Sequence, residues 1–546
     1  MTIGPLIVQS DKTALLEVDH PDAANARHDL AIFAELERAP EHIHTYRITR
    51  LGLWNARAAG HDSDFVIGVL DKYAKFPIPS TVRQDIAETM SRYGRLSIRR
   101  GEDDQLELFS SDRAVLLEAS RNKKISMLLD GPIGNEAFKI QDWARGQVKQ
   151  ELLKLGWPAE DFAGYAEGTP HAIDLSSGDD WKIRDYQSQA VEKFWVGGSG
   201  VVVLPCGAGK TIVGAAAMAT AKTNTLILVT NTVSARQWKS ELLRRTTLTE
   251  DEIGEYSGSV KEIKPVTIAT YQILTTKRKN EYAHLALLNA NDWGLIVYDE
   301  VHLLPAPIFK MSADLQARRR LGLTATLVRE DGKEGDVFSL IGPKRFDAPW
   351  KEIEAQGYIA PAACFEVRID MAEEERFNYA ISNQDEKYRL AATSAVKIPV
   401  IQKLLKKHAG EPTLIIGQYL DQIHAISGAL RVPEITGETP VDERERLFEQ
   451  FRSGDITTLV VSKVANFSVD LPEASVALQI SGSYGSRQEE AQRLGRLLRP
   501  KADGRAAAFY TLITRDTVDQ DFAQNRQRFL AEQGYSYEII DAHELD

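Results

Sequence analysis

From about residue 175 onward, short runs of β-branched apolar residues alternate with longer stretches of helical periodicity. Apolar runs without alternating polar positions are typical of strands buried on both faces of a parallel sheet. The pattern therefore predicts an α/β fold with two doubly wound parallel sheets. The predicted strands are 200–204, 225–229, 266–269 and 295–298 in the first set, and 413–416, 458–461, 476–480 and 507–510 in the second.

Glycine and proline residues lie between the two sets, at 342–343 and again at 357–361, and they predict a hinge. We therefore expect two α/β domains of similar size, at 176–345 and 346–546. A helical segment rich in charged residues lies near 371–396, within the second domain.

The first 175 residues follow another pattern and predict α+β accessory domains. Amphipathic helices are expected at 64–75 and 80–93, because two prolines interrupt the chain between them. Alternating residues at 95–99 and 105–109, separated by a polar turn, predict a β-hairpin. Helix, helix and hairpin in this order favour a winged-helix module within 1–112, and a generic small α+β domain is the alternative. Residues 113–175 are expected to form a small αβ domain.

The composition is that of a globular protein, with 43% hydrophobic and 26% charged residues among 546. Apolar residues never run for the roughly 20 positions that a membrane-spanning helix needs. The first residues also lack the basic and apolar segments of a secretory signal. The two cysteines, Cys206 and Cys364, are too few for a disulfide scaffold or a Cys-rich metal module. We expect a cytoplasmic protein with no membrane partner.

The net charge of −12 is unusual for a protein that binds nucleic acid, which often carries a basic surplus. Residues 1–180 hold 21 Lys and Arg against 29 Asp and Glu, and the remaining two thirds of the chain hold 45 against 49. A narrow cleft needs only local positive charge to hold phosphates. The charge therefore neither supports nor excludes a nucleic-acid substrate.

A candidate phosphate-binding loop lies at 204–211, which reads LPCGAGKT between a predicted strand and a helical run. Such a loop turns backbone N–H groups and a helix amino terminus toward phosphates. The backbone can approach the phosphates closely at Gly207 and Gly209, and Ala208 between them is a further candidate binding residue. Lys210 would reach the phosphate charge, and Thr211 would offer its hydroxyl to Mg²⁺. Leu204 departs from the general Walker pattern, which has glycine there.

Two adjacent carboxylates, Asp299 and Glu300, follow the predicted strand 295–298. Carboxylates at the end of a buried strand are costly unless they have partners. Together with the loop, they indicate that Asp299 holds the Mg²⁺ of bound ATP and that Glu300 polarises the attacking water. A capped strand end with acidic loop residues is the alternative.

The sequence DEVH at 299–302 resembles the signature of the DExH helicases of superfamily 2. LTAT at 323–326, with Thr324 and Thr326, resembles their third motif, which couples the ATP site to the nucleic-acid track. QRLGRLLR at 492–499 resembles their sixth. The resemblance implies two RecA-like domains, with Arg496 and Arg499 acting as arginine fingers and Gln492 touching the γ-phosphate or its water.

Other residues match this family less specifically. Gln187 resembles the glutamine that reads the adenine edge, and Arg184 would be a second contact. Asp470 resembles the aspartate of the fifth motif, which contacts ribose or couples the domains. The candidate DNA contacts are Arg236, Thr270, Tyr271, Gln272, Ser462 and Lys463, and for each of them an ordinary surface position is the alternative.

The resemblance is strongest to the XPB-type helicases. Arg329, Glu330 and Asp331 form the triplet of that branch directly after the third motif, and 484–493 matches its approach to the sixth. The segment near 371–396 occupies the place of the thumb-like insertion of that branch, and 113–175 that of its damage-recognition domain. The resemblance implies an ATP- and Mg²⁺-dependent 3′-to-5′ helicase or translocase. The triplet would separate strands at a fork.

The expected partners are single-stranded and forked or duplex DNA, together with a repair nuclease or a transcription protein, and the chain is expected to be a monomer or weak oligomer. DNA repair is the expected task. Two alternatives remain open: an RNA-directed DExH motor, and a remodelling scaffold that binds ATP without separating strands.

Overall fold

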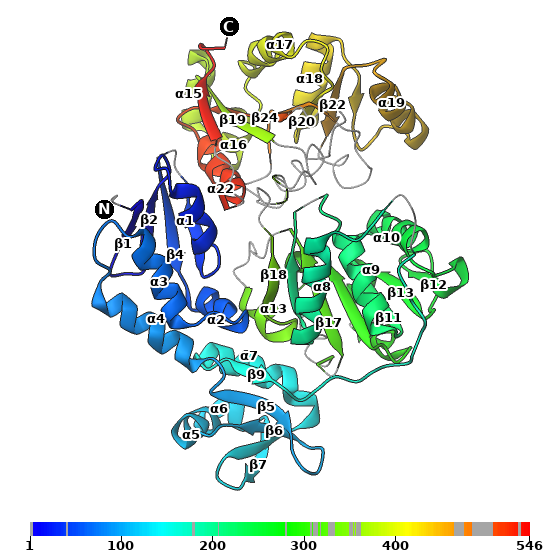
Figure 1. The fold of residues 1–546 in the computed structure, drawn as a ribbon. Helices are drawn as coiled ribbons and strands as arrows, with labels where there is room; N and C mark the ends of the chain where they lie inside the picture. Colours follow the sequence, from blue (N-terminus) through cyan, green and yellow to red (C-terminus); the bar gives the residue numbers. More distant parts are fainter. Residues whose placement is uncertain are drawn as a thin grey trace.

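The computed structural model describes residues 4–545, except for 40–41, 177–180, 206, 279–280, 306–307, 309–314, 317, 326–333, 349–352, 354, 356–361, 463–473, 483–505 and 533–536. Two large α/β bodies and two smaller N-terminal units follow one another along the chain (Figure 1). Among the described residues, no helix combines the length and apolar character needed to cross a membrane.

The first α/β domain contains a seven-stranded sheet in which every pair of neighbours is parallel. Its strand order is β12-β13-β11-β16-β17-β10-β18. The strands are β10 (Gly200–Val203), β11 (Thr225–Val229), β12 (Ile253–Tyr256), β13 (Val266–Thr270), β16 (Leu295–Asp299), β17 (Arg319–Thr324) and β18 (Lys344–Asp347). The helices that matter for the site are α8 (Asp185–Gly197), α9 (Lys210–Ala221), α10 (Thr232–Arg245), α11 (Tyr271–Thr275) and α13 (Glu334–Leu340).

The second α/β domain contains another all-parallel sheet of seven strands, in the order β21-β22-β20-β23-β24-β19-β25. These strands are β19 (Ala362–Ile369), β20 (Thr413–Gly417), β21 (Glu434–Ile435), β22 (Thr458–Ser462), β23 (Val476–Gln479), β24 (Ala507–Thr514) and β25 (Tyr537–Asp541). Its helices include α15 (Glu373–Ile381), α16 (Gln384–Ala392), α17 (Lys397–Lys407), α18 (Leu420–Leu430), α19 (Val441–Ser453) and α22 (Val518–Glu532). Helices α15 and α16 occupy the predicted insertion.

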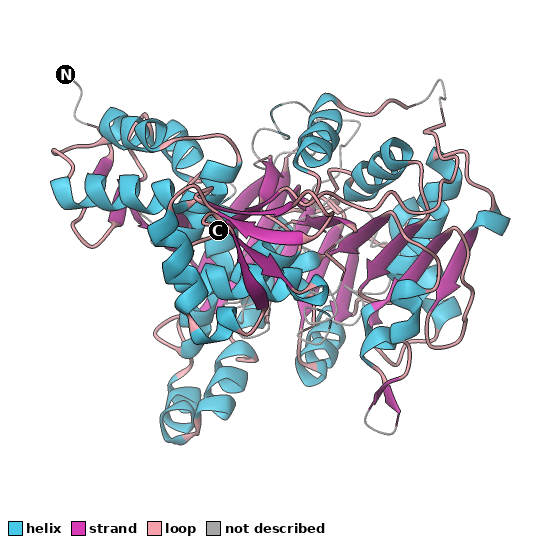
Figure 2. Ribbon diagram, turned by 90° about the horizontal axis from the view of Figure 1, so that it is seen from below, coloured by secondary structure: helices cyan, strands magenta, loops and turns pink. Residues whose placement is uncertain are grey.

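The two sheets share one topology. Numbered along the chain within each domain, the strands of both sheets lie in the order 3-4-2-5-6-1-7. Helices cover the strands on both faces, as Figure 2 shows. The predicted tandem of doubly wound parallel sheets is therefore confirmed. The predicted division at 345/346 falls inside β18, which completes the first sheet, so the first domain extends at least to residue 347.

The N-terminal unit, residues 4–92, is a four-stranded antiparallel sheet with helices packed around one hydrophobic core. Its strands are β1 (Leu6–Val8), β2 (Thr13–Glu17), β3 (Ala34–Arg38) and β4 (Ile43–Ile48). Its helices are α1 (Ala23–Leu30), α2 (Arg50–Ala58), α3 (Ser63–Tyr73) and α4 (Ser80–Arg92), the last two being the predicted amphipathic pair.

The five-stranded unit, residues 95–165, has its own sheet and its own core. Its elements are β5 (Leu96–Arg100), β6 (Leu106–Phe109), α5 (Arg113–Arg121), α6 (Lys123–Ser126), β7 (Leu129–Ile133), β8 (Ala137–Ile140), α7 (Arg145–Leu155) and β9 (Ala159–Asp161). Strands β5 and β6 form the predicted hairpin.

The winged-helix prediction is wrong, although its helices and its hairpin are present. Apolar residues of the hairpin, such as Ile98 and Leu108, are buried against α5 and α7. Apolar residues of α3 and α4, such as Leu70 and Ile86, are buried against β1–β4 instead. Helices and hairpin thus belong to different cores, and the break between the units lies near residues 93–95 and not at 112.

Candidate active site

The candidate site lies at the carboxyl-terminal edge of the first sheet. Strand β10 leads into the 204–211 loop, and β16 ends in Asp299. Strand β17 lies between them and pairs with both, so the loop and the carboxylates leave the same edge two strands apart. Ligands of open α/β sheets bind at this edge.

The 204–211 loop has the backbone shape that its glycines permit. Gly207 and Gly209 have φ angles of 80° and 78°, in the left-handed region that favours glycine. Space is also limiting, because a Cβ on Gly209 would lie 2.5 Å from Nε2 of Gln187. Helix α9 then begins at Lys210 and runs for 12 residues, with Lys210 and Thr211 in its first turn. The loop therefore has the strand–turn–helix form of a phosphate cradle.

Leu204 does not obstruct this loop. Its side chain is fully buried in the hydrophobic core of the domain, and its backbone N–H donates to the carbonyl of Thr324 at 2.9 Å. A side chain that is buried in the core takes no space from the loop. The departure from the general Walker pattern is therefore accommodated by packing.

Asp299 is held by side chains from two other elements. The indole Nε1 of Trp238, on α10, donates to its Oδ2 at 2.8 Å. The hydroxyl of Tyr271, at the start of α11, donates to its backbone carbonyl at 2.7 Å. The sequence gives no signal for either contact with Asp299, because Trp238 lies 61 residues and Tyr271 lies 28 residues before Asp299 in the chain.

Glu300 follows in an uncommon conformation, with φ 49° in the left-handed region. Its carboxylate Oε1 lies 3.3 Å from Nζ of Lys210, and its Oε2 lies 3.5 Å from Nδ1 of His302. Strained non-glycine residues are concentrated at functional sites, where the surrounding structure holds them in place. The turn thus directs Glu300 toward the lysine of the loop.

The two carboxyl groups have pKa values shifted in opposite directions. Burial, reinforced by the neighbouring Glu300 charge, raises the pKa of Asp299 to about 6. Burial would also raise the pKa of Glu300, but the Lys210 ammonium and His302 outweigh it and lower that pKa below its usual value. Paired groups with pKa values pushed apart are typical of catalytic sites. Glu300 is therefore ionised at neutral pH.

His302 links the carboxylates to the end of β17. Its Nδ1 lies 2.7 Å from Oγ1 of Thr324, and both residues are buried. The fourth letter of the DExH pattern and the first threonine of the LTAT segment are thus in contact. This contact connects Glu300 with the segment that leaves β17 at residue 325.

Gln187 is buried, with 1% of its surface exposed, and it contacts the 204–211 loop. Its Nε2 donates to the carbonyl of Ala208 at 2.9 Å, and its Oε1 accepts from the backbone N–H of Arg184 at 3.0 Å. The hydroxyl of Tyr186 donates to the same Ala208 carbonyl at 2.8 Å. The structure thus gives Gln187 a bracing contact with the loop, and the contacts of Gln187 and Arg184 with adenine stay predictions.

The candidate DNA contacts differ in exposure. Arg236 on α10 and Gln272 on α11 are exposed. Thr270 and Tyr271 are each 3% exposed, and the Thr270 side chain caps α11 by accepting from Ile273 N–H. Ser462 is buried at the end of β22. Thr270 and Tyr271 therefore fit a coupling role better than a direct contact through their side chains.

Several candidate residues lie outside the described part of the chain. They are Thr326, Arg329, Glu330 and Asp331 after β17, Lys463 and Asp470 after β22, and Gln492, Arg496 and Arg499 before β24. Their assignments stay predictions.

Three family models match the chain. The ERCC3/RAD25/XPB C-terminal helicase model matches residues 353–545, the model of the type III restriction enzyme res subunit matches 180–329, and that of a helicase conserved C-terminal domain matches 6–130. The second match contains the 204–211 loop and both carboxylates.

The chain is also similar to full-length relatives. It is 67% identical over 546 residues to the DNA 3′-5′ helicase XPB of Kineococcus radiotolerans, covering all of this chain and 98% of that one. It is 62% identical over 545 residues to the protein of that name from Mycobacterium tuberculosis, covering 100% and 99%. It is 34% identical to the general transcription and DNA repair factor IIH helicase/translocase subunit XPB of Antonospora locustae, covering 99% and 82%.

Proposed function

Because the chain belongs to the XPB family of DNA 3′-5′ helicases, we propose that it binds and hydrolyses ATP between the 204–211 loop and the carboxylates Asp299 and Glu300. The chain is an ATP-dependent DNA helicase of the XPB type. The observation that carries the site assignment is the ion pair between Lys210 and Glu300, which joins loop and carboxylates at one sheet edge.

The roles of the residues follow from charge and position. The amino terminus of α9 and the Lys210 ammonium attract the β- and γ-phosphates of ATP. Ionised Glu300 accepts a hydrogen bond from the attacking water and orients it toward the γ-phosphorus. Lys210 exchanges its contact with Glu300 for the phosphates, which leaves the carboxylate free for this water.

Thr211 and Asp299 offer a hydroxyl and a carboxylate oxygen, the oxygen ligands that Mg²⁺ prefers. The bound ion would neutralise phosphate charge during the transfer. The Trp238 N–H orients the Asp299 carboxylate, as outer hydrogen bonds commonly do for metal ligands. Two oxygen donors at one sheet edge, one of them fixed by an indole, therefore fit a Mg²⁺–ATP complex.

Catalysis is completed across the cleft between the two α/β domains. Arg496 and Arg499 would stabilise charge on the γ-phosphate, and Gln492 would contact the same phosphate or its water. Asp470 would couple the domains or contact ribose. The identical strand order of the two sheets supports this arrangement, because two domains of one topology are what a pair of RecA-like domains requires.

DNA would run across both domains, held mainly through its phosphates. Arg236 and Gln272 are exposed and suited to this contact. Tyr271 and Thr324 would couple DNA binding to the ATP site. The Tyr271 hydroxyl donates a hydrogen bond to the carbonyl of Asp299, and Thr324 contacts His302. The triplet 329–331 would act as a wedge at the fork, and Lys463 would be a further phosphate contact.

We assign the helicase to DNA repair, with a nuclease or a transcription protein as its partner. The name of the Antonospora locustae relative, which includes both transcription and DNA repair, supports the repair task and a transcription protein as partner.

The discriminating experiment measures ATP hydrolysis with DNA and RNA oligonucleotides of the same sequence, together with unwinding of duplexes that carry a 3′ or a 5′ tail. We expect stimulation by DNA and unwinding of the 3′-tailed duplex. Stimulation by RNA alone would favour the RNA-directed motor. Full function of a Glu300→Gln variant would favour the scaffold that binds ATP as a structural ligand.

A further inference from the structure

The N-terminal unit touches both α/β domains at once. In Figure 1 it lies beside β18 and α13 of the first domain and beside α22 of the second. Its sheet and four helices share one hydrophobic core, so it moves as one body. A single body that contacts both domains constrains their relative orientation.

The contact with the first domain reaches the strand beside the ATP loop. The side-chain Oδ1 of Asn55, on α2, accepts from the backbone N–H of Lys344 at 3.0 Å. Lys344 begins β18, which pairs with β10, the strand that leads into the 204–211 loop. Within the unit, α2 is fixed because the Trp54 indole donates to the carbonyl of Thr89 on α4 at 3.0 Å.

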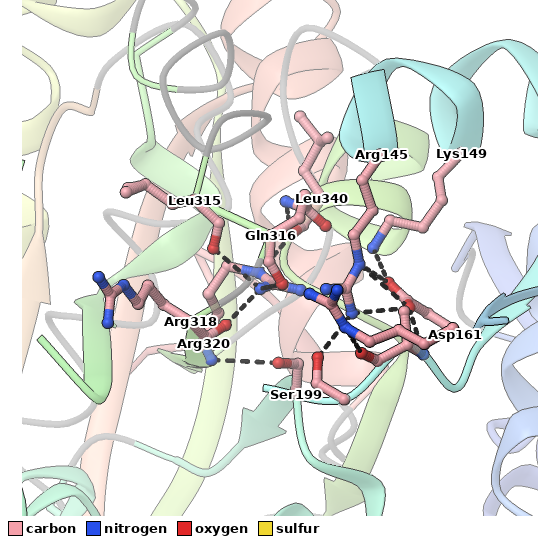
Figure 3. A network of polar contacts seen from close by, with 12 residues as sticks. Arg145, Lys149, Asp161, Ser199, Leu315, Gln316, Arg318, Arg320 and Leu340 are labelled. Atoms are coloured by element: carbon pink, nitrogen blue, oxygen red, sulfur yellow. Dashed lines mark hydrogen bonds and ion pairs between the residues drawn. The ribbon is translucent and has the colours of Figure 1, made fainter. Parts of the chain in front are cut away.

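The five-stranded unit contacts both the N-terminal unit, where Arg92 of α4 lies 4.9 Å from the centroid of the Trp157 ring, and the first domain. Nε2 of Gln150 on α7 donates to Asp336 on α13 at 2.9 Å. Arg145 and Lys149, also on α7, both bind the largely buried Asp161 at 2.8 Å, close to Arg320 of β17 (Figure 3).

Arg320 itself is 1% exposed and donates to the carbonyls of Leu315, Gln316, Arg318 and Leu340. The ring of Tyr165 lies within 5.8 Å of the guanidinium carbons of Arg145, Arg319 and Arg320. Across the joint run the ring contacts of Tyr165 with Arg319 and Arg320 and the hydrogen bond from Gln150 to Asp336, and these contacts hold the five-stranded unit against the first domain.

The contact with the second domain is smaller and is made by α22. Nη1 of Arg528 donates to the backbone carbonyl of Glu37 on β3 at 2.6 Å. Ala531, three residues later, is 5% exposed and belongs to the core of the N-terminal unit. No ion pair between described residues accompanies this contact, so no charged pair has to be separated when it opens.

The first turns of α22 are anchored in the second domain. Asp519 lies 3.0 Å from Nζ of Lys397 on α17, and both side chains are 1% exposed. The ring of Phe522 packs edge-on against Tyr388 of α16, with centroids 4.8 Å apart. With 15 residues, α22 is about 22 Å long. Its first turns pack in the second domain, and its second half contacts the N-terminal unit, which in turn contacts the first domain.

We propose that the N-terminal unit is an internal brake on the ATPase cycle, and that the contact of α22 with β3 must open before the interdomain cleft can close. This inference rests on the proposed function, because closure matters only if hydrolysis is completed across the cleft. DNA that draws the two domains together would open the contact and so couple hydrolysis to its substrate.

The test uses Arg528→Ala and Ala531→Asp in the full-length protein, with ATPase measured without and with saturating DNA. Both variants should raise the DNA-independent rate by about fivefold or more, the lower end of typical intramolecular coupling. The DNA-stimulated rate should stay at the wild-type level. Arg452→Ala on α19 removes an arginine of the same domain whose partner is Glu449 on the same helix, and it should change neither rate.

Amide hydrogen exchange supplies a readout that is independent of activity. In the wild type, DNA with a non-hydrolysable ATP analogue should accelerate exchange in β3 and in the second half of α22, and leave α7 protected. Unchanged DNA-independent rates in both variants, or undiminished protection of β3 in the DNA complex, would overturn the brake. If DNA fails to stimulate the ATPase of the wild type, this result would contradict the proposed function instead. The wild type is therefore measured before the variants.

Discussion

Nζ of Lys210 lies 3.3 Å from Oε1 of Glu300, so the lysine of the phosphate loop is paired with the carboxylate proposed to activate water. Both side chains are mostly buried, which strengthens the attraction and keeps Glu300 ionised. The pair also has a direct mechanistic meaning. When ATP attracts the lysine, the carboxylate loses its cation and becomes a stronger hydrogen-bond acceptor at the moment when water must be oriented.

Glu300→Gln should retain ATP binding and lose turnover, because the amide keeps the shape of the side chain but cannot accept a proton. We expect kcat to fall by at least about 100-fold. Lys210→Ala should instead weaken nucleotide binding. Equilibrium binding of a fluorescent ATP analogue together with steady-state ATPase separates the two effects. Glu192→Gln, on the exposed face of α8, is the control; undiminished ATPase in both site variants would refute the assignment.

Trp238→Phe should raise the Mg²⁺ concentration needed for half-maximal ATPase. The ring is kept, but Asp299 loses the N–H that orients its carboxylate at 2.8 Å. Loss of such an outer hydrogen bond typically weakens metal binding by about 10- to 100-fold. Trp293→Phe is the matched control, because that buried indole donates to the carbonyl of Leu287. An equal shift in both variants would indicate a general packing effect.

Gly209→Ala should abolish nucleotide binding for two independent reasons. The φ of 78° is unfavourable for alanine, and the new Cβ would lie 2.5 Å from Nε2 of Gln187. Gly428→Ala is the control, since it lies in the interior of α18 with open space at its Cβ, where alanine favours the helix. Calorimetric titration with ATP measures the difference, and binding at wild-type affinity by Gly209→Ala would show that the loop has another shape.

Acid should destabilise the N-terminal unit through His44. Burial, with a contribution from the charge of Arg27, lowers the pKa of His44 from 6.5 to about 4. The unfolded chain therefore binds a proton between pH 6.5 and 4 that the folded unit does not, so stability is complete above pH 6.5 and declines as the pH falls toward 4. At pH 5 the loss is about 2 kcal/mol.

Denaturant unfolding of wild type and His44→Gln at pH 7.5 and pH 5, followed by a probe in the N-terminal unit, measures this loss. The wild type should lose more stability than the variant over this interval. Equal losses in the two proteins would show that His44 titrates in the folded unit as it does in the unfolded chain.

The apolar runs of the chain were sufficient to predict four of the seven strands in each α/β domain, namely β10, β11, β13 and β16 in the first and β20, β22, β23 and β24 in the second. A strand buried on both faces of a parallel sheet needs a continuous apolar segment, and this requirement is local. Residues 200–204 and 295–298 were predicted as strands and form β10 and β16. The predicted strands also indicated where the 204–211 loop and the two carboxylates lie, because the loop follows β10 and the carboxylates stand at the end of β16.

The sequence alone thus determined the class of fold and the resemblance to XPB-type helicases, and it predicted the roles proposed for Lys210 and Glu300. Contacts between distant segments were decided only by the tertiary structure, because no local pattern specifies which apolar faces meet. They gave the β5–β6 hairpin a core separate from α3 and α4, and placed Leu204 in the interior. They also joined Trp238 to Asp299 across 61 residues, and Arg528 to Glu37 across 491.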